Sequence, residues 1–282
     1  MNKNVHTFLG CDADYEQSRT VLFGAPFDST TSFRPGARFG CAAMRQESVG
    51  LETYSPYQDR DLCDASVFDG GDLDLVFGSA QRALAQIRAC TEEILRDGKL
   101  PVMMGGEHLV TLGAMEAVVK KYPEVRVIHL DAHADLRDDY MGEKLSHATV
   151  MRRVWELVGD GHIYQLGIRS GEKTEFAFAG EHTELYPFAL QTAAQVAAEV
   201  ADSPVYLSID LDVLDCGVFP GTGTPEAGGA TFRELLEALL RFAPLHIVGC
   251  DVVELAPMLD TSGASTATAC KLLRELLLLL RH

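Results

Sequence analysis

The sequence lacks the long apolar runs and the paired cysteines of membrane proteins and disulfide-built proteins. Its longest leucine run, within KLLRELLLLLRH, has five members, whereas a membrane-spanning helix needs about 20 apolar residues. The amino-terminal MNKNVHTFLGCDADYEQ has no apolar core of signal-peptide length. The seven cysteines are odd in number and form no CxxC pair, which excludes a disulfide framework and a zinc knuckle. We therefore expect a cytoplasmic protein without a membrane partner.

Basic charge is also scarce. The chain has 24 Lys and Arg against 41 Asp and Glu, which gives a net charge of −17. A phosphate backbone binds clustered Lys and Arg, so no nucleic-acid partner is expected, whereas cationic substrates and metal ions suit this charge. Apolar residues make up 47% of the chain and charged residues 23%, which are ordinary values for a globular protein and exclude a disordered one.

Short β-branched runs alternate along the chain with longer segments of helical periodicity. The pattern predicts strands at 21–26, 102–105, 125–130, 163–168, 205–211 and 247–253. It predicts helices at 79–97, 109–121, 147–158, 231–241 and 267–280. Several strands are apolar at consecutive positions, as in a parallel sheet that is covered on both faces. This alternation, with no linker to interrupt it, predicts one α/β domain over residues 1–282.

Three of the predicted strands run directly into ionisable residues. These are His108 of GGEH, Asp131, His133 and Asp135 of DAHAD, and Asp210 and Asp212 of SIDLD. Ligands of open α/β sheets bind beyond the carboxyl ends of the strands, where these side chains are expected to meet. Because side chains alternate along a strand, we expect the ionisable members of each motif to point one way. The small or apolar residues between them would then face the buried side.

Four carboxylates packed together repel each other unless cations hold them. Structural zinc prefers a closed set of Cys and His, and calcium prefers oxygen alone. A mixed His and Asp set with open positions indicates Mn²⁺, with other divalent first-row ions as alternatives. Six ligands suit two ions ~3.5–4 Å apart that share carboxylates, and a water bridging them would become hydroxide near neutral pH.

Each motif taken alone has a plainer interpretation. DxHxD fits a turn or a loose calcium loop, DxD after a strand fits a cap or a solvated edge, and GGEH fits a tight turn entering a helix. The occurrence of all three at predicted strand ends of one chain favours the metal site.

In this order, GGEH, DAHAD and SIDLDVLD resemble the motifs of the ureohydrolase family of arginases and agmatinases. The resemblance extends over nearly the whole chain, because GAPFDSTTSFRPGARFG, LSHAT, GTGTPEAGG and DVVELAP are similar to agmatinase segments in particular. It implies an arginase-like three-layer α/β/α fold with a largely parallel central sheet. It also implies a binuclear manganese site and assembly into homo-oligomers, as trimers or hexamers.

The resemblance also assigns residues to the two ions. One manganese is implied to bind four residues: His108, Asp131, Asp135 and Asp210. The other is implied to bind His133, Asp131, Asp210 and Asp212, so that Asp131 and Asp210 bridge. His147 matches a proton shuttle at the edge of the site, and Glu254 matches the partner of the substrate guanidinium. Taken alone, His147 also fits a helix start and Glu254 a solvated strand end.

The implied reaction is hydrolysis of agmatine to putrescine and urea. A metal-activated hydroxide is strong enough to attack the resonance-stabilised guanidinium carbon at neutral pH. A carboxylate such as Glu254 can orient the planar cation through paired charge-assisted hydrogen bonds, and a histidine can pass a proton to the leaving amine.

The choice of substrate rests on the loop at 136–146. Its acidic residues, Asp138, Asp139 and Glu143, suit the ammonium end of agmatine, although they also fit a solvated loop. Arg137 and Lys144 could instead serve a carboxylate, so guanidinobutyrate and arginine remain alternative substrates.

Two segments depart from the family pattern, at 216–219 and at 259–265, and both are expected near the mouth of the site. Cys216, in the first of them, fits either a reactive thiol or a buried inert one. Two other functions stay open: a zinc-dependent deacetylase, since a DxH…D pattern on a related fold serves that chemistry, and a metal-bound structural or regulatory oligomer without turnover.

Overall fold

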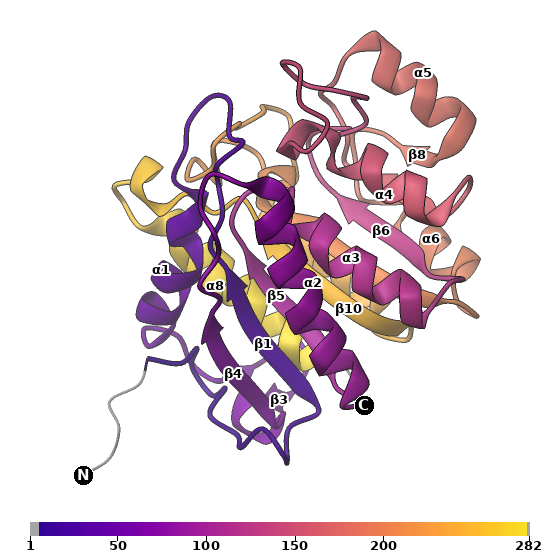
Figure 1. Cartoon of the computed structure of the whole chain (residues 1–282). Helices are drawn as coiled ribbons and strands as arrows, with labels where there is room; N and C mark the ends of the chain where they lie inside the picture. The colour runs from indigo at the N-terminus through magenta and orange to yellow at the C-terminus, as the bar shows by residue number, and fades with distance from the viewer. Residues whose placement is uncertain (1–5, 281–282) are drawn as a thin grey trace.

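The computed structural model describes residues 6–280, and a sheet of eight parallel strands lies at its centre (Figure 1). The strands are β1 Thr20–Ala25, β4 Val67–Asp72, β5 Leu100–Gly105, β6 Arg126–Leu130, β7 Ile163–Leu166, β8 Glu184–Tyr186, β9 Pro204–Asp210 and β10 His246–Val253. They are ordered β4-β1-β5-β10-β9-β6-β7-β8, and every neighbouring pair is parallel. A separate antiparallel pair joins β2 Tyr54–Ser55 to β3 Arg60–Asp61.

Helices cover both faces of this sheet. They are α1 Gly40–Ser48, α2 Ala80–Arg96, α3 Val110–Lys121, α4 Val150–Val158, α5 Lys173–His182, α6 Ala193–Glu199, α7 Phe232–Phe242 and α8 Ala264–Leu279. In Figure 1, α2, α3 and α4 lie in front of the sheet and α8 lies behind it. Residues of α2, α3 and α4 share one apolar core, and residues of α1, α6, α7 and α8 share the other. The fold therefore has three layers, α/β/α, as predicted.

Consecutive residues of the central strands feed the two cores in turn. In β9, Leu207 and Ile209 belong to the core under α8, and Tyr206 belongs to the core under α3. This arrangement explains why the strands read as continuous apolar runs in the sequence. Among residues 6–280, no helix is long and apolar enough to cross a lipid bilayer.

The six predicted strands and five predicted helices are all present, with bounds that shift by a few residues. Helix starts follow capping chemistry: the Ser79 side chain accepts the backbone N–H of Arg82 at 3.4 Å. The predicted 147–158 helix begins as a 3₁₀ turn, His147–Thr149, and becomes α-helical at Val150.

The sequence pattern missed β2, β3, β4, β8, α1, α5 and α6, of which β2 and β3 have only two residues each. β4 carries the polar run Asp-Gly-Gly-Asp, and β8 has only three residues, so neither shows the β-branched pattern used for the other strands. The three helices have between seven and ten residues, which is too short for a clear apolar periodicity.

Candidate metal centre

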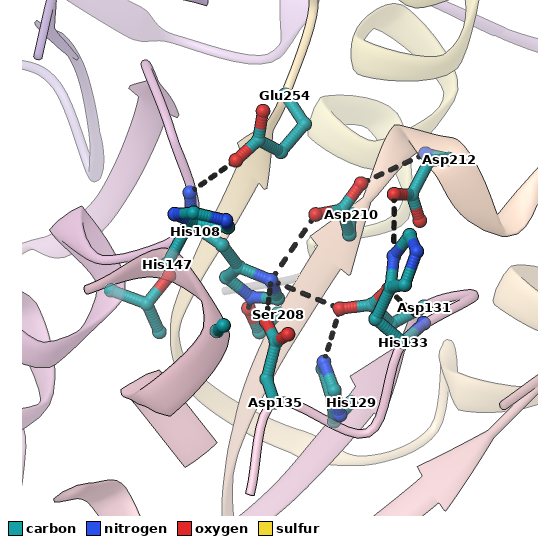
Figure 2. Close-up of polar contacts among 12 residues, drawn as sticks. His108, His129, Asp131, His133, Asp135, His147, Ser208, Asp210, Asp212 and Glu254 are labelled. Carbon is teal, nitrogen blue, oxygen red and sulfur yellow. Dashed lines mark hydrogen bonds and ion pairs between the residues drawn. The ribbon is translucent and has the colours of Figure 1, made fainter. Parts of the chain in front are cut away.

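The four central strands each deliver an ionisable residue to one edge of the sheet (Figure 2). Asp210 ends β9 and Asp131 follows β6, whereas His108 and Glu254 lie just beyond β5 and β10. Because the strands are parallel, all their carboxyl ends meet at this edge. The structure thus brings together residues that lie up to 146 positions apart in the chain.

The chain leaves β6 and β9 by the same hydrogen-bonded turn. Asp131 Oδ1 accepts the backbone N–H of His133 at 2.6 Å, and Asp210 Oδ1 accepts that of Asp212 at 2.8 Å. Aspartate favours such turns because its short side chain reaches the backbone two residues on. The prediction that strand alternation aims these side chains was therefore wrong, since β6 ends one residue before Asp131 and Asp212 lies in a 3₁₀ turn. The residues between them are buried, as predicted: Ala132, Ala134 and Leu211.

Two of the candidate residues have left-handed backbone conformations. Asp135 has φ 54° and Glu254 has φ 67°. This region is costly for residues other than glycine, and it is held only where the surrounding structure fixes it. Figure 2 shows that the carboxylates of both residues point toward the other ionisable groups of the site.

His108 lies at the centre of the first group of potential ligands. Its Nδ1 is 3.0 Å from Asp131 Oδ2, 3.3 Å from Asp135 Oδ2 and 3.2 Å from Asp210 Oδ2. The atom is fully buried yet makes no hydrogen bond of acceptable geometry. A buried imidazole nitrogen that faces three carboxylate oxygens needs a positive charge between them, and an imidazole and carboxylate donor set of this kind can bind a metal cation.

A second group is formed by Asp131, His133 and Asp212, and it shares Asp131 with the first. His133 Nδ1 lies 2.9 Å from Asp212 Oδ2 and 3.6 Å from Asp131 Oδ1. Asp210 adjoins both groups, because one of its oxygens faces His108 and the other accepts the Asp212 amide. Two overlapping groups of nitrogen and carboxylate oxygen donors fit a pair of adjacent divalent cations.

Without cations, the pKa values of this cluster are strongly displaced. Burial raises the pKa of Asp210 well above its usual range, and the charges of Asp212 and Asp131 raise it further. Burial and the Asp131 charge raise the pKa of Asp135 to about 6. Burial opposes protonation of His108, but the surrounding carboxylates outweigh it and raise its pKa. Bound cations would take over the role of these protons, so metal binding would release them.

A buried network of hydroxyl groups holds the ring of His108 through Nε2, the nitrogen that faces away from the three carboxylates. Its Nε2 is 2.9 Å from Ser208 Oγ, whose hydroxyl donates to Asp251 Oδ1 at 2.8 Å. Asp251 also accepts hydroxyl hydrogens from Thr111 and Tyr206, at 2.9 Å and 2.7 Å. Because the Ser208 proton is committed to Asp251, Ser208 accepts from His108, so Nε2 carries the hydrogen and Nδ1 keeps a free lone pair.

A second network orients Asp131. The Gln165 amide donates to the Ala134 carbonyl at 2.9 Å and to His129 Nδ1 at 3.1 Å. His129 Nε2 therefore carries the hydrogen and donates to Asp131 Oδ2 at 2.8 Å. His129 lies among the potential ligand atoms of the first group, but this proton makes it a support for Asp131 rather than a ligand.

Sequence reasoning missed both networks. Ser208, Asp251, His129 and Gln165 are all completely buried and lie inside apolar strands. A polar residue in the middle of a buried strand is the signal that could have found them, because such a group needs a partner.

His147 and Glu254 border the same site. The Glu254 carboxylate accepts the backbone N–H of His108 at 2.8 Å, and burial together with the nearby Glu107 raises its pKa. His147 Nε2 lies 3.3 Å from Ser32 Oγ. Burial lowers the pKa of His147 to about 4, so its ring is neutral at physiological pH.

Glu107, the acidic residue of GGEH, anchors the 27–32 segment beside His147. Its completely buried carboxylate accepts the backbone N–H of Thr30 at 3.0 Å and the Thr31 hydroxyl at 3.0 Å. Thr30 Oγ1 in turn accepts the backbone N–H of His147 at 3.2 Å. The preceding Gly106 permits this contact, because a Cβ there would lie 1.9 Å from the Phe27 carbonyl oxygen.

A cavity of about 420 Å³ opens onto these groups. Its lining includes His147, Glu254 and five of the six predicted ligands: His108, His133, Asp135, Asp210 and Asp212. Asp131 lies beneath them and is completely buried. The size suits a small-molecule ligand.

The loop acids expected at the mouth do not line this cavity. Asp138 pairs instead with Arg153 at 2.9 Å, and the loop contributes Arg137 and Tyr140 to the lining. Other carboxylates take the place of the loop acids: Glu172, Glu175 and Glu226.

Neither segment that departs from the family pattern lines the cavity. In the first, Cys216 is half-buried and Phe219 is completely buried. In the second, Asp260 accepts the backbone N–H of Ser265 at 2.8 Å and so closes the first turn of α8. Neither segment therefore belongs to the cavity wall, although both were expected near the mouth of the site.

Comparisons with known proteins agree with this geometry. Residues 18–279 match the model of the arginase family. The agmatinase of Bacillus cereus is 46% identical over 275 residues, which cover 96% of this chain and 95% of the relative. A solved Clostridium difficile structure, provisionally described as an agmatinase, has 52% identity and a TM-score of 0.93, with 94% of this chain and 98% of that one covered. The solved arginase of Bacillus caldovelox shares the fold, with a TM-score of 0.78 and 22% identity. That match covers 92% of this chain and 98% of the arginase chain. The chain therefore belongs to the arginase family.

Proposed function

We propose that the protein hydrolyses agmatine to putrescine and urea with two manganese ions per chain. The family membership makes the chain a hydrolase of guanidino compounds, of the agmatinase-like amidinohydrolase type. Its 46% identity with curated agmatinases over almost the full length supports agmatine as the substrate. The mixed imidazole and carboxylate donor set supports manganese.

The observation that carries the proposal is the position of His108. A buried, unbonded nitrogen with three carboxylate oxygens within 3.3 Å has no stabilising partner other than a proton or a cation. We assign one ion to His108, Asp131, Asp135 and Asp210. The second is assigned to His133, Asp131, Asp210 and Asp212. When bound, the ions supply Lewis-acid activation of water for attack on the guanidinium carbon.

Glu254 would hold the guanidinium. It borders the cavity on the side of β10, and its one fixed hydrogen bond, from the His108 backbone, leaves the rest of the carboxylate available. Burial raises its pKa, and a bound guanidinium would restore its charge by a direct ion pair. Paired hydrogen bonds from the planar cation then orient the reacting carbon.

His147 would carry the proton that the leaving amine requires. Its ring is neutral near pH 7, because burial lowers its pKa to about 4, so Nε2 can take up a proton during the reaction and pass it on. Ser32 Oγ and the Thr30 hydroxyl hold the ring and the backbone of His147 at the cavity wall.

The experiment is a urea-release assay of the manganese-loaded protein with agmatine, arginine and 4-guanidinobutyrate. The proposal predicts the highest kcat/KM for agmatine and loss of turnover after chelation that manganese restores. A preference for arginine would refute the agmatine assignment. Release of no urea from any guanidino compound would favour a non-enzymatic role, and one tightly held zinc per chain would favour a deacetylase.

We propose further that the protein works in the cytoplasm as a homo-oligomer, a trimer or a hexamer, with residues 1–282 as one domain. All seven cysteines are free, which suits a reducing compartment. The described residues share one continuous central sheet, which supports a single domain. Light scattering coupled to gel filtration would measure the oligomeric state.

A further inference from the structure

The cavity lining away from the predicted ligands contains a cluster of charged side chains, which we name the charged wall. It consists of Arg137, Glu172, Glu175 and Glu226. Among the described residues that line the cavity, Arg137 is the only Lys or Arg. The charged wall therefore contains one positive charge and three carboxylates, and it has an excess of negative charge.

Arg137 is already engaged by two of these carboxylates. Its Nη1 lies 3.2 Å from Glu172 Oε1, and its Nε lies 3.3 Å from Glu175 Oε2. The guanidinium also stacks on Tyr140, with its carbon 4.5 Å from the ring centroid. A substrate carboxylate would have to compete with both glutamates for this cation.

The two glutamates differ in what they can do for a ligand. The Glu175 side chain is 4% exposed and accepts the backbone N–H groups of Leu136 and Glu172, at 3.0 Å and 2.7 Å. It is part of the framework that joins α5 to the loop after β6. The Glu172 side chain is 57% exposed and precedes the first residue of α5, so its charge is available at the cavity.

We infer that Glu172 is a specificity-determining residue, which selects guanidino substrates with a cationic tail by occupying Arg137 and by adding negative charge to the cavity. This inference rests on the proposed function. An ammonium tail gains attraction from the excess carboxylates of the charged wall. A carboxylate tail loses Arg137, the one Lys or Arg among the described residues of the lining.

The test is Glu172→Gln, which keeps the size and polarity of the side chain and removes its charge. Formation or loss of one exposed ion pair changes a binding equilibrium constant by about 1.5- to 5-fold. We therefore expect kcat/KM for agmatine to fall about 3-fold and kcat/KM for 4-guanidinobutyrate to rise about 3-fold, a change of about 10-fold in their ratio. The change should fall on KM rather than kcat, and it should shrink in ~1 M salt, where charges are screened beyond about 3 Å.

Two controls separate this effect from a general disturbance. 1-Butylguanidine has a neutral tail, so its kcat/KM should be unchanged by Glu172→Gln. Glu237→Gln removes a matched surface charge, since Glu237 is 59% exposed and lies 2.8 Å from Arg233 on α7. It should leave all three substrates unaffected.

A double-mutant cycle tests whether Glu172 acts on carboxylates through Arg137. In an Arg137→Gln background, Glu172→Gln should improve 4-guanidinobutyrate less than it does in the wild type, because only the repulsion by the Glu172 charge is then removed, and it should still weaken agmatine. If the wild type prefers agmatine and Glu172→Gln changes all three substrates equally or not at all, the inference is overturned and the proposed function stands. If the wild type prefers 4-guanidinobutyrate, both are overturned.

Discussion

Substitution of Ser208 by alanine tests how the fold prepares His108 to bind a cation. The hydroxyl connects His108 Nε2, at 2.9 Å, to Asp251 Oδ1, at 2.8 Å, and it holds the hydrogen of the ring on Nε2. Without it, either nitrogen can carry the hydrogen, and a ring with its hydrogen on Nδ1 cannot bind a cation through that atom until it changes tautomer. Removing such an outer hydrogen bond typically costs 10–100-fold in metal affinity, which is about 1.4–2.7 kcal/mol.

The same substitution also affects folding stability. Asp251 is completely buried and would keep only two of its three hydroxyl donors, those of Thr111 and Tyr206. Loss of a hydrogen bond to a buried charged group costs about 1.5–3 kcal/mol. Stability alone therefore cannot identify the role of Ser208, and a control of equal chemistry is needed.

Ser48→Ala is that control. Ser48 is also completely buried, and its hydroxyl donates to the Arg45 carbonyl at 2.9 Å and accepts the Leu9 amide at 3.0 Å, away from the site. Titration calorimetry with Mn²⁺ should show weaker binding for Ser208→Ala and wild-type affinity for Ser48→Ala. Equal affinity in wild type and Ser208→Ala, or equal weakening in both variants, would refute the reasoning.

Two further predictions concern the GGEH segment. Gly106→Ala places a Cβ 1.9 Å from the Phe27 carbonyl oxygen and should lower the free energy of unfolding by about 3 kcal/mol or more. The control Gly180→Ala, with open space around its Cβ, should raise that free energy by about 0.5–1 kcal/mol. Urea unfolding measures both variants, and an unchanged stability of Gly106→Ala would contradict the close approach. Burial raises the pKa of Glu107 from 4.5 to about 7. Between pH 4.5 and pH 7 the folded protein therefore holds a proton that the unfolded chain has lost. The contribution of Glu107 to the free energy of unfolding is complete below pH 4.5 and is lost as pH rises through 7. The difference in unfolding free energy between wild type and Glu107→Gln should change by about 3 kcal/mol over that interval, and a constant difference would contradict the raised pKa.

The sequence predicted the parts of the site that lie at the ends of strands. His108, Asp131 and Asp210 occur where apolar runs stop. The carboxyl ends of parallel strands meet at one edge of the sheet, so this prediction does not depend on the conformations of the loops. The three-layer architecture followed from the same pattern, because strands that are apolar on both faces require helices on both sides.

The rest depends on contacts across the chain that no local pattern carries. Glu172 meets Arg137 because α5 begins beside the loop after β6, a placement set by tertiary packing. The acids of that loop were expected to face the substrate, but Asp138 turns toward Arg153 instead. The composition of the loop after β6 therefore predicted acidic residues near the site, whereas tertiary packing determines which carboxylates line the cavity.

The most direct test of the account is a count and location of bound manganese, by anomalous diffraction at the manganese edge from crystals of the loaded protein. The account predicts two peaks per chain, one beside His108 Nδ1 and the other beside His133 Nδ1, with Asp131 and Asp210 between them. A single ion, no ion, or peaks away from these residues would contradict it.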